Sequence, residues 1–443
     1  MDPLVISGIM IILLIFFIFL GVYVGVTLAF LSFMGVWLMT GDIEIATRLL
    51  GTTSFSAIMD YTFGVIPFFV AMGLLANVSG ASSDLYTFFG LLTRRIRGGL
   101  GIATVFSNAV FAAITGVSVA SAAVFSKVSL PEMLKAGYQK NFSLGIVAGS
   151  SVLGMLIPPS VLFVLYGIIS QEAIGRLFMA GILPGLLLTA IYSIGIILMA
   201  TRNPKLVMTQ ETVSAWKTQE KIGTDRFATA ILKCLGILPL IIVTLGGIWA
   251  GFFTPTEAGA VGAFGALVLG LVKRKISPSG FWKVLLETGI TTSGIFFLLI
   301  AAQMYSRMLA ISGLVQWLSA WVMALNVSPI IIILLFLLIF MVMGCFIDSC
   351  SIMLLTLPLM LPLVVKLGYD LIWFGVVSVV TIEVGLITPP FGMVAFSMKT
   401  ALGGEATIDD IFRGSYPFLF MLAITIAIII LFPSLSTWLP SLM

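Results

Sequence analysis

The chain has 443 residues, of which 60% are hydrophobic and only 9% are charged. Soluble proteins average about 25% charged residues, so the composition excludes a soluble globular protein and predicts an integral membrane protein in a lipid bilayer. The net charge of +4 does not indicate a nucleic-acid partner, and the lack of histidine removes the commonest metal ligand and the usual proton shuttle near neutral pH.

The chain opens with residues 3–41, which carry no charge. About 20 residues form one helical span, so this stretch predicts two spans. No short charged segment with a small-residue cleavage site precedes it, and we expect it to be retained rather than removed as a signal peptide. The next expected elements are a surface segment (42–61), a third span (64–79) and an interfacial segment (82–97).

Residues 98–133 contain two apolar limbs that meet at residues 115–118. Each limb is too short to cross a bilayer and is nearer the 10–14 residues of a re-entrant segment. We therefore predict a helical hairpin that enters the membrane and returns to the same side.

Residues 142–170 are long enough to span, but their composition opposes a continuous helix. Gly149 and Gly154 each cost about 1 kcal/mol in a helix interior. Pro158 and Pro159 remove two backbone donors. A break at membrane depth is tolerated only where protein or a water-filled cavity receives the freed backbone groups, so we predict a broken span.

The rest of the chain contains similar elements. The expected order is a span (177–201), a basic loop (202–226), three spans (227–251, 257–272 and 288–306), a surface arm (309–326), a second hairpin (328–362) with its tip near 344–349, a second broken span (371–398) and a last span (415–434).

The two hairpins and the two broken spans are related by a constant offset of 231 residues. This offset superposes Gly137-Tyr138 on Gly368-Tyr369, Leu130-Pro131 on Leu361-Pro362, Ser118 on Ser349, Gly154 on Gly385, and Pro158-Pro159 on Pro389-Pro390. Matches at one offset indicate an internal repeat. Paired Gly/Pro-interrupted spans point to the binding site of a secondary transporter.

The charges of the loops predict how the repeats are oriented. The loops 202–226 and 273–283 are basic and should be cytoplasmic, whereas 42–52, the counterpart of 273–283, holds Asp42 and Glu44 against Arg48. The repeats should therefore be inverted, with the first hairpin entering from the cytoplasm, the second from outside, and both chain ends outside. We divide the chain into a first repeat (1–201), a cytoplasmic loop (202–226) and a second repeat (227–443).

The hairpin tips and breaks are also rich in oxygen atoms. Freed carbonyls and hydroxyls suit Na⁺, and the amide ends of broken helices suit anions. The hydroxyl groups belong to Thr115, Ser118, Ser121, Ser150 and Ser151 in the first half, and to Ser349, Ser351, Thr381 and Thr388 in the second. The alternative is that these hydroxyls bond their own helices and only allow close helix packing.

Asp348 and Glu383 are ionisable groups within apolar runs. Such groups are costly in a bilayer and are candidates for function. The alternative for both is a structural carboxylate that caps a helix end.

Four motifs resemble a known family. They are Phe253-Thr-Pro-Thr-Glu-Ala258, Leu156-Ile-Pro-Pro-Ser160, Phe346-Ile-Asp348 and Gly385-Leu-Ile-Thr-Pro-Pro390. Together they are similar to the large membrane subunit of TRAP transporters (tripartite ATP-independent periplasmic transporters), and the similarity runs through almost the whole chain.

The resemblance implies an all-α polytopic protein of the bacterial inner membrane, with inverted repeats and an elevator-type division into scaffold and transport domain. It implies Na⁺-driven uptake of an organic anion, such as a dicarboxylate, sialic acid, another sugar acid or a sulfonate. The implied partners are a small four-helix membrane subunit and a periplasmic substrate-binding protein.

The family's sites lie at the hairpins and the broken spans, which places them on this chain's clusters. The resemblance implies two or more bound Na⁺ ions, held by Thr115, Gly116, Ser118, Gly149, Ser151, Gly154, Gly344, Asp348, Thr381 and Gly385. Substrate would contact Ser118, Ser150, Ser349 and Thr388. In the first tip, Val117 stands where the family usually has a second hydroxyl residue.

Other functions fit the sequence less well. A channel would need a ring of subunits or a continuous polar lining, and an enzyme would need a nucleophile–base pair or a metal cluster. A carboxylate symporter that works without partners stays open, and an ATP-driven permease would need a coupled ATPase.

Overall fold

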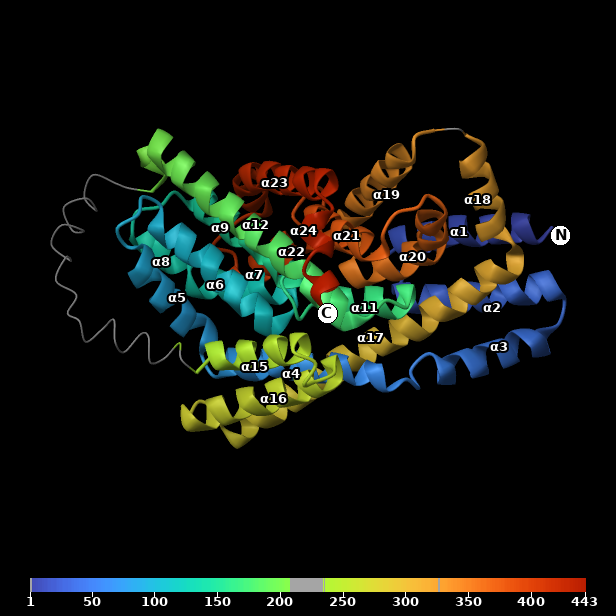
Figure 1. Ribbon diagram of the computed structural model, residues 1–443, viewed down its shortest axis with the longest axis horizontal. Coiled ribbons are helices and arrows are strands. Elements are labelled where there is room, and N and C mark those ends of the chain that lie inside the picture. The colour runs from blue at the N-terminus through green and yellow to red at the C-terminus, as the bar shows by residue number, and fades with distance from the viewer. Residues whose placement is uncertain (1, 208–233, 235, 326) are drawn as a thin grey trace.

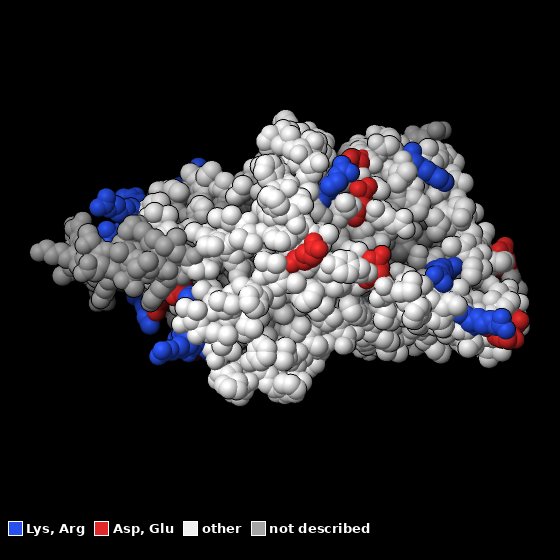
Figure 2. Space-filling view, turned by 60° about the horizontal axis from the view of Figure 1, so that its bottom comes forward, with Lys and Arg blue, Asp and Glu red and all other residues white. Residues whose placement is uncertain are grey.

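The structure is a computed structural model, and it describes residues 2–207, 234, 236–325 and 327–443. These residues form helices and connecting segments with no strand among them. Seven of the described helical segments are long and apolar enough to cross a membrane. Most of the Lys and Arg side chains on the face in Figure 2 lie toward the two ends of the molecule, as expected for a protein whose middle lies in lipid.

One set of helices packs against the long helix α17, either directly or through α4 and α16, and we call it the α17 group. Its members are α1 (Pro3–Phe19), α2 (Val24–Thr40), α3 (Ile43–Ser56), α4 (Val65–Val78), α15 (Leu238–Trp249), α16 (Pro255–Val272) and α17 (Pro278–Ser312). In Figure 1, α4, α15 and α16 lie together at the bottom of the view, and α17 runs from them toward α2 and α3. Apolar side chains of this group, among them Phe264, Trp282 and Ile290, are exposed, as expected where lipid replaces water.

The remaining large helices form the hairpin bundle. They are α6 (Gly99–Thr115), α7 (Ser118–Val128), α9 (Lys140–Ser151), α10 (Leu153–Leu156), α11 (Val161–Ser170), α12 (Ile174–Arg202), α19 (Pro329–Gly344), α20 (Ser349–Lys366), α21 (Leu371–Leu386), α22 (Met393–Leu402) and α23 (Ile408–Leu431). Short connecting elements are α5 (Ala81–Thr93), α8 (Leu130–Lys135), α18 (Leu314–Ala324), α24 (Ser434–Thr437) and the 3₁₀ turns Tyr61–Gly64, Pro204–Leu206 and Pro440–Leu442.

The Thr254-Pro-Thr-Glu257 motif has a local structural role. The amide of Thr254 donates to Glu257 Oε2 at 2.8 Å, and the amide of Glu257 donates to Thr254 Oγ1 at 3.3 Å. This is a capping box, which satisfies two amides that the first turn of α16 would otherwise leave free.

Helix α17 corrects two of the sequence-based boundaries. It begins at Pro278, ten residues before the expected span 288–306, because Ser277 accepts a hydrogen bond from the Gly280 amide and Pro278 occupies the first turn. It continues to Ser312 and ends at Gly313, whose φ of +71° stops the helix. The surface arm therefore begins at Leu314 rather than at Leu309.

Other expected elements match helices with shifted ends, or fall outside the described residues. The expected spans 177–201 and 415–434 correspond to α12 and α23. Most of the expected loop 202–226 and the start of the span 227–251 lie outside the described residues.

Helices α2 and α17 run side by side in the same direction. Gly25 packs against Phe297, and Gly35 packs against Met308 further along both helices. Thr40 at the end of α2 therefore lies toward the Ser312 end of α17, whereas Lys273-Arg274-Lys275 precedes the other end. A helix of 35 residues is about 52 Å long, enough to separate these ends by a whole bilayer.

This geometry leads to a prediction about topology. Single cysteines in place of Asp42 and Lys275, both exposed, should be labelled by an impermeant maleimide from opposite sides: the first from outside and the second from the cytoplasm. The chain without these substitutions provides the background from its own cysteines. Labelling of both positions from one side would contradict the inverted orientation.

Candidate functional site

The tip of the first hairpin lies in the break of the first broken span. Helix α6 ends at Thr115, Gly116 has a φ of +63°, and α7 begins at Ser118. The carbonyl of Gly116 accepts a hydrogen bond from the amide of Val161 at 3.3 Å. A Cβ atom at Gly154 would lie only 3.0 Å from the amide nitrogen of Ser118. Only glycine allows this approach, so the tip and the break form one unit.

The first broken span consists of α9, α10 and α11. The Pro158–Pro159 bond is cis, and Ser160 begins α11 by accepting a hydrogen bond from the amide of Phe163 at 3.4 Å. Most side chains in this segment are buried. Protein therefore surrounds the interrupted backbone, as a break at membrane depth requires.

The second hairpin packs on its broken span through two glycines. Helix α19 ends at Gly344, and a Cβ atom there would lie 2.8 Å from the Cα atom of Gly385 in α21 and 2.8 Å from the carbonyl oxygen of Ile382. The tip is also held by the amide of Gly392, which donates to the carbonyl of Cys345 at 3.4 Å. Each hairpin thus contacts the broken span of its own half.

Asp348 caps the second limb of this hairpin. Its carboxylate accepts a hydrogen bond from the amide of Ser351 at 2.9 Å and another from the Ser351 hydroxyl. Helix α20 begins at the next residue, Ser349, just as α7 begins at Ser118. Helix capping is therefore one role that the geometry gives to Asp348.

Glu383 is a fully buried carboxyl group beside this hairpin tip. The hydroxyl of Ser349 donates to Glu383 Oε1 at 3.1 Å. Ser118 from the first hairpin lies beside the same carboxyl group. Within the described residues, neither Ser118 Oγ nor Glu383 Oε2 has a hydrogen-bond partner. A charged group in this position needs compensation, because burial of an ion costs several kcal/mol.

The two halves of the hairpin bundle meet around this carboxyl group. The hydroxyl of Ser397 in α22 donates to the carbonyl of Val119 in α7 at 3.1 Å, and α22 and α7 pack together. The second broken span therefore contacts the first hairpin as well as its own.

Several of the expected ligand hydroxyls bond their own helices. Thr115 donates to Phe111, Ser151 to Ala148, Thr381 to Val377 and Thr388 to Val384, each to a backbone carbonyl. Their oxygen lone pairs stay available as acceptors, because a hydroxyl that donates one hydrogen bond still has two acceptor positions.

Not every predicted residue lies at the tips. Gly149 packs against Phe418 of α23, with a Cβ atom there only 2.6 Å from Phe418 Cβ. Ser150 accepts a hydrogen bond at 2.7 Å from the amide group of Asn108. The structure brings together Gly116, Ser118 and Gly154 in one half, and Gly344, Ser349 and Gly385 in the other.

Two residues are more important to the geometry of the candidate site than the sequence alone indicated. Glu383 was a candidate on charge alone, and its position between Ser118 and Ser349 makes it the acidic centre of the site. Asn108 was not singled out, although an amide side chain within an apolar hairpin limb is a detectable signal. In the described residues its Oδ1 atom is buried without a partner.

Comparisons with known proteins bear on the family and the fold of the chain. A family model described as "Tripartite ATP-independent periplasmic transporter, DctM component" matches residues 11–435. The chain is 34% identical to the C4-dicarboxylate TRAP transporter large permease protein of Pseudomonas aeruginosa over 89% of this chain and 90% of that protein. It is 30% identical to the sialic acid TRAP transporter large permease protein of Vibrio cholerae over 96% of both. The solved YdaH transporter of Alcanivorax borkumensis shares the fold, with a TM-score of 0.61 and 17% identity over 90% of this chain and 89% of that one.

The glycine contact of the second hairpin can be tested by adding one methyl group. Gly344→Ala would place a Cβ atom against backbone of α21 that cannot rotate away, and overpacking of this kind costs about 1–3 kcal/mol. We expect a lower thermal unfolding midpoint in detergent and reduced transport. Gly289→Ala in α17 is the matched control, because its Cβ atom meets nothing within 4 Å. Equal midpoints for the two variants would show that Gly344 and Gly385 do not pack as described.

Proposed function

Since the chain belongs to the DctM component family of tripartite ATP-independent periplasmic transporters, we propose that it uses a Na⁺ gradient to drive the uptake of a small organic anion. It is the large permease subunit of a transporter for organic acids and a multi-pass protein of the inner membrane. We propose the coupling ion, the residues that bind the ion and the substrate, and the way in which the hairpin bundle moves.

The observation that carries the proposal is the position of Glu383 between the two hairpins. Its carboxyl group is fully buried, contacts Ser349, lies beside Ser118, and takes part in none of the ion pairs found among the described residues. Carboxylate, hydroxyl and carbonyl oxygens are hard ligands suited to small cations. A bound Na⁺ would supply the missing positive charge.

We place Na⁺ at the two contacts between hairpin and broken span. In the first half the proposed ligands are Thr115, Gly116, Ser118, Gly149, Ser151 and Gly154, and in the second they are Gly344, Asp348, Thr381 and Gly385, with Glu383 added from its geometry. The glycines would act through their carbonyl oxygens. Gly149, which packs against Phe418 rather than at a tip, would have to reach the ion from the neighbouring turn of α9.

The substrate is proposed to be a carboxylate or a related anion between the two hairpins. Ser118, Ser150, Ser349 and Thr388 are its proposed contacts. The relatives named for C4-dicarboxylate and for sialic acid set the range of substrates. The proposed partners are a small membrane subunit and a periplasmic binding protein, and the hairpin bundle is proposed to move past the α17 group as an elevator.

The first test is the dependence of transport on Na⁺. The chain, its small subunit and its binding protein would be reconstituted in liposomes and given labelled succinate or N-acetylneuraminate. We expect uptake only with an inward Na⁺ gradient, because hydroxyl and carbonyl oxygens bind Na⁺ and the chain has no histidine to relay protons. Full uptake with a proton gradient alone would contradict Na⁺ coupling. Equal uptake without the binding protein would instead identify a symporter that needs no partner.

The second test is the substitution Glu383→Gln. Glutamine keeps the size of the side chain and can still accept the hydrogen bond of Ser349, but it removes the negative charge. We expect the Na⁺ concentration for half-maximal uptake to rise about tenfold or more, which corresponds to about 1.4 kcal/mol of lost binding energy. Asp348→Asn should have a smaller effect, because Ser351 already binds that carboxylate.

The control for this substitution is Glu257→Gln in the exposed capping box of α16. It also removes one carboxylate, but outside the hairpin bundle, and glutamine can serve in a capping box. Its Na⁺ dependence should match that of the parent, and the amount of each variant in the membrane must be measured. An unchanged Na⁺ requirement in Glu383→Gln at normal protein level would remove Glu383 from the cation site.

A further inference from the structure

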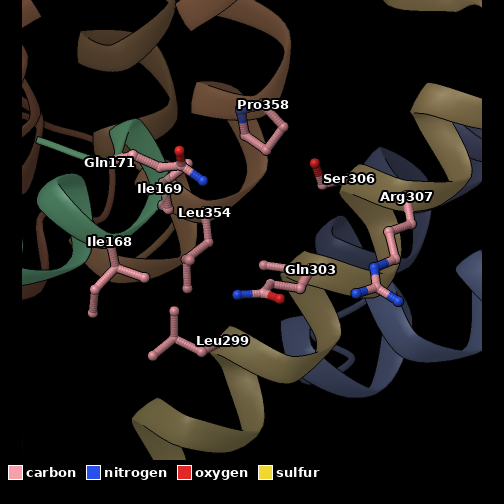
Figure 3. A pocket seen from close by; sticks show the side chains of 10 residues that line it. Ile168, Ile169, Gln171, Leu299, Gln303, Ser306, Arg307, Leu354 and Pro358 are labelled. Atoms are coloured by element: carbon pink, nitrogen blue, oxygen red, sulfur yellow. The ribbon is translucent and has the colours of Figure 1, made fainter. Parts of the chain in front are cut away.

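A cavity lies between the α17 group and the hairpin bundle, away from both hairpin tips, and we call it the outer cavity. Its volume is about 250 Å³, and its walls come from α17, from the end of α11 and from α20. Figure 3 shows Gln171 and Pro358 on one side of this space and Leu299 and Gln303 on the other. None of the residues that line it belongs to the candidate site at the tips.

All the polar side chains that line this outer cavity can donate hydrogen bonds. Gln303, Ser306 and Arg307 stand three and four residues apart on α17 and so share one face of the helix. Gln171 follows the end of α11 in a left-handed conformation with a φ of +59°. Together they present one guanidinium, two amides and one hydroxyl, and the described lining residues include no acidic one.

Arg307 is only half-buried, and no carboxylate of the described residues neutralises its charge. Its guanidinium donates a hydrogen bond to Ser56 Oγ of α3 at 3.2 Å, and it takes part in none of the ion pairs found in the described part of the chain. Arginine has five donor hydrogens in a planar fork that matches a carboxylate, so most of its donors remain for a ligand.

The outer cavity lies near the end of α17 at which substrate would arrive. Arg307 is five residues from the Ser312 end of α17, the end toward which α2 brings Asp42 and opposite to the basic Lys273-Arg274-Lys275 segment. In the proposed orientation this end faces outside. The charge of Arg307 therefore lies on the side from which an organic anion is delivered.

We propose that the outer cavity binds the carboxylate or sulfonate group of a small organic anion, with Arg307 as the charged partner and Gln171, Gln303 and Ser306 as further donors. The volume is slightly below the about 300–1,000 Å³ of pockets for drug-sized ligands, which suits a small acid or the acidic end of a larger one. The inference takes the chemical class of the ligand from the proposed function, and the side of the membrane that the cavity faces from the proposed orientation. The site would hold the anion before it reaches the tips.

The test uses cysteine chemistry and needs neither transport nor Na⁺. Ile168, an apolar and half-buried wall residue, is replaced by cysteine in the full chain, which is purified in a neutral detergent. Its rates of modification by a negatively charged methanethiosulfonate (ethylsulfonate) and a positively charged one (ethyltrimethylammonium) are compared. We expect the negative reagent to react faster, and Arg307→Gln to lower the ratio of the two rates about tenfold.

Two controls separate the charge of Arg307 from general effects. Arg307→Lys keeps the charge and should keep most of the preference. Arg176→Gln removes another arginine near the same end of α11, one that already lies 4.0 Å from Glu172, and should leave the ratio unchanged. An unchanged ratio in Arg307→Gln, or faster reaction with the positive reagent in the parent, would overturn the proposal.

Competition then tests for a free anion. Millimolar succinate, isethionate or N-acetylneuraminate should slow the modification of Ile168→Cys when Arg307 is present, and should not when it is glutamine. Lack of protection by all three would also overturn the proposal. Because no gradient or partner is present, these outcomes are independent of whether transport is driven by Na⁺.

Discussion

The structure depends on how it satisfies backbone groups where a helix is interrupted inside the membrane. A free amide or carbonyl costs several kcal/mol in hydrocarbon, so a broken span can exist only with another segment placed against it. Here each break is covered by the tip of a hairpin at a distance that only glycine permits. Gly154 faces Ser118 in the first half, and Gly344 faces Gly385 in the second. The same contacts collect backbone carbonyls and hydroxyls in two places that are otherwise surrounded by apolar side chains.

The buried carboxyl group of Glu383 gives these two places a common centre. It contacts Ser349, the first residue of α20, and lies beside Ser118, the first residue of α7. Both serines follow a hairpin tip and lie at equivalent positions of the sequence repeat. A cation bound here would therefore contact residues of both hairpins, which offers a physical route by which ion binding and the position of the hairpins affect each other.

The α17 group provides the frame against which the hairpin bundle is held. Lys273 at the end of α16 forms an ion pair of 2.6 Å with Asp84 of α5, and both side chains are about one-fifth exposed. Helix α5 in turn packs against α6, the first limb of the first hairpin. The outer cavity with Arg307 lies at another contact between frame and bundle, so a movement of the bundle along α17 would change the walls of that cavity.

The sequence by itself determined the membrane class, most of the spans and the two Gly/Pro-interrupted regions, because these features arise from local composition and from the roughly 20 residues that a bilayer requires. Only the tertiary structure decided three features: the position of Glu383 between Ser118 and Ser349, the bond between Asn108 and Ser150, and the lack of a carboxylate partner for Arg307 among the described residues. The two ends of α17 are determined by residues next to them in the sequence. A hydropathy pattern alone did not reveal them, since the first turns of this helix are polar enough to resemble a loop. Contacts between residues far apart in the chain depend on which helices pack together, and a uniformly apolar sequence contains little information about its partners. The physical reason is that lipid and protein interior are equally apolar, so hydrophobicity places a segment in the membrane without specifying the face that packs.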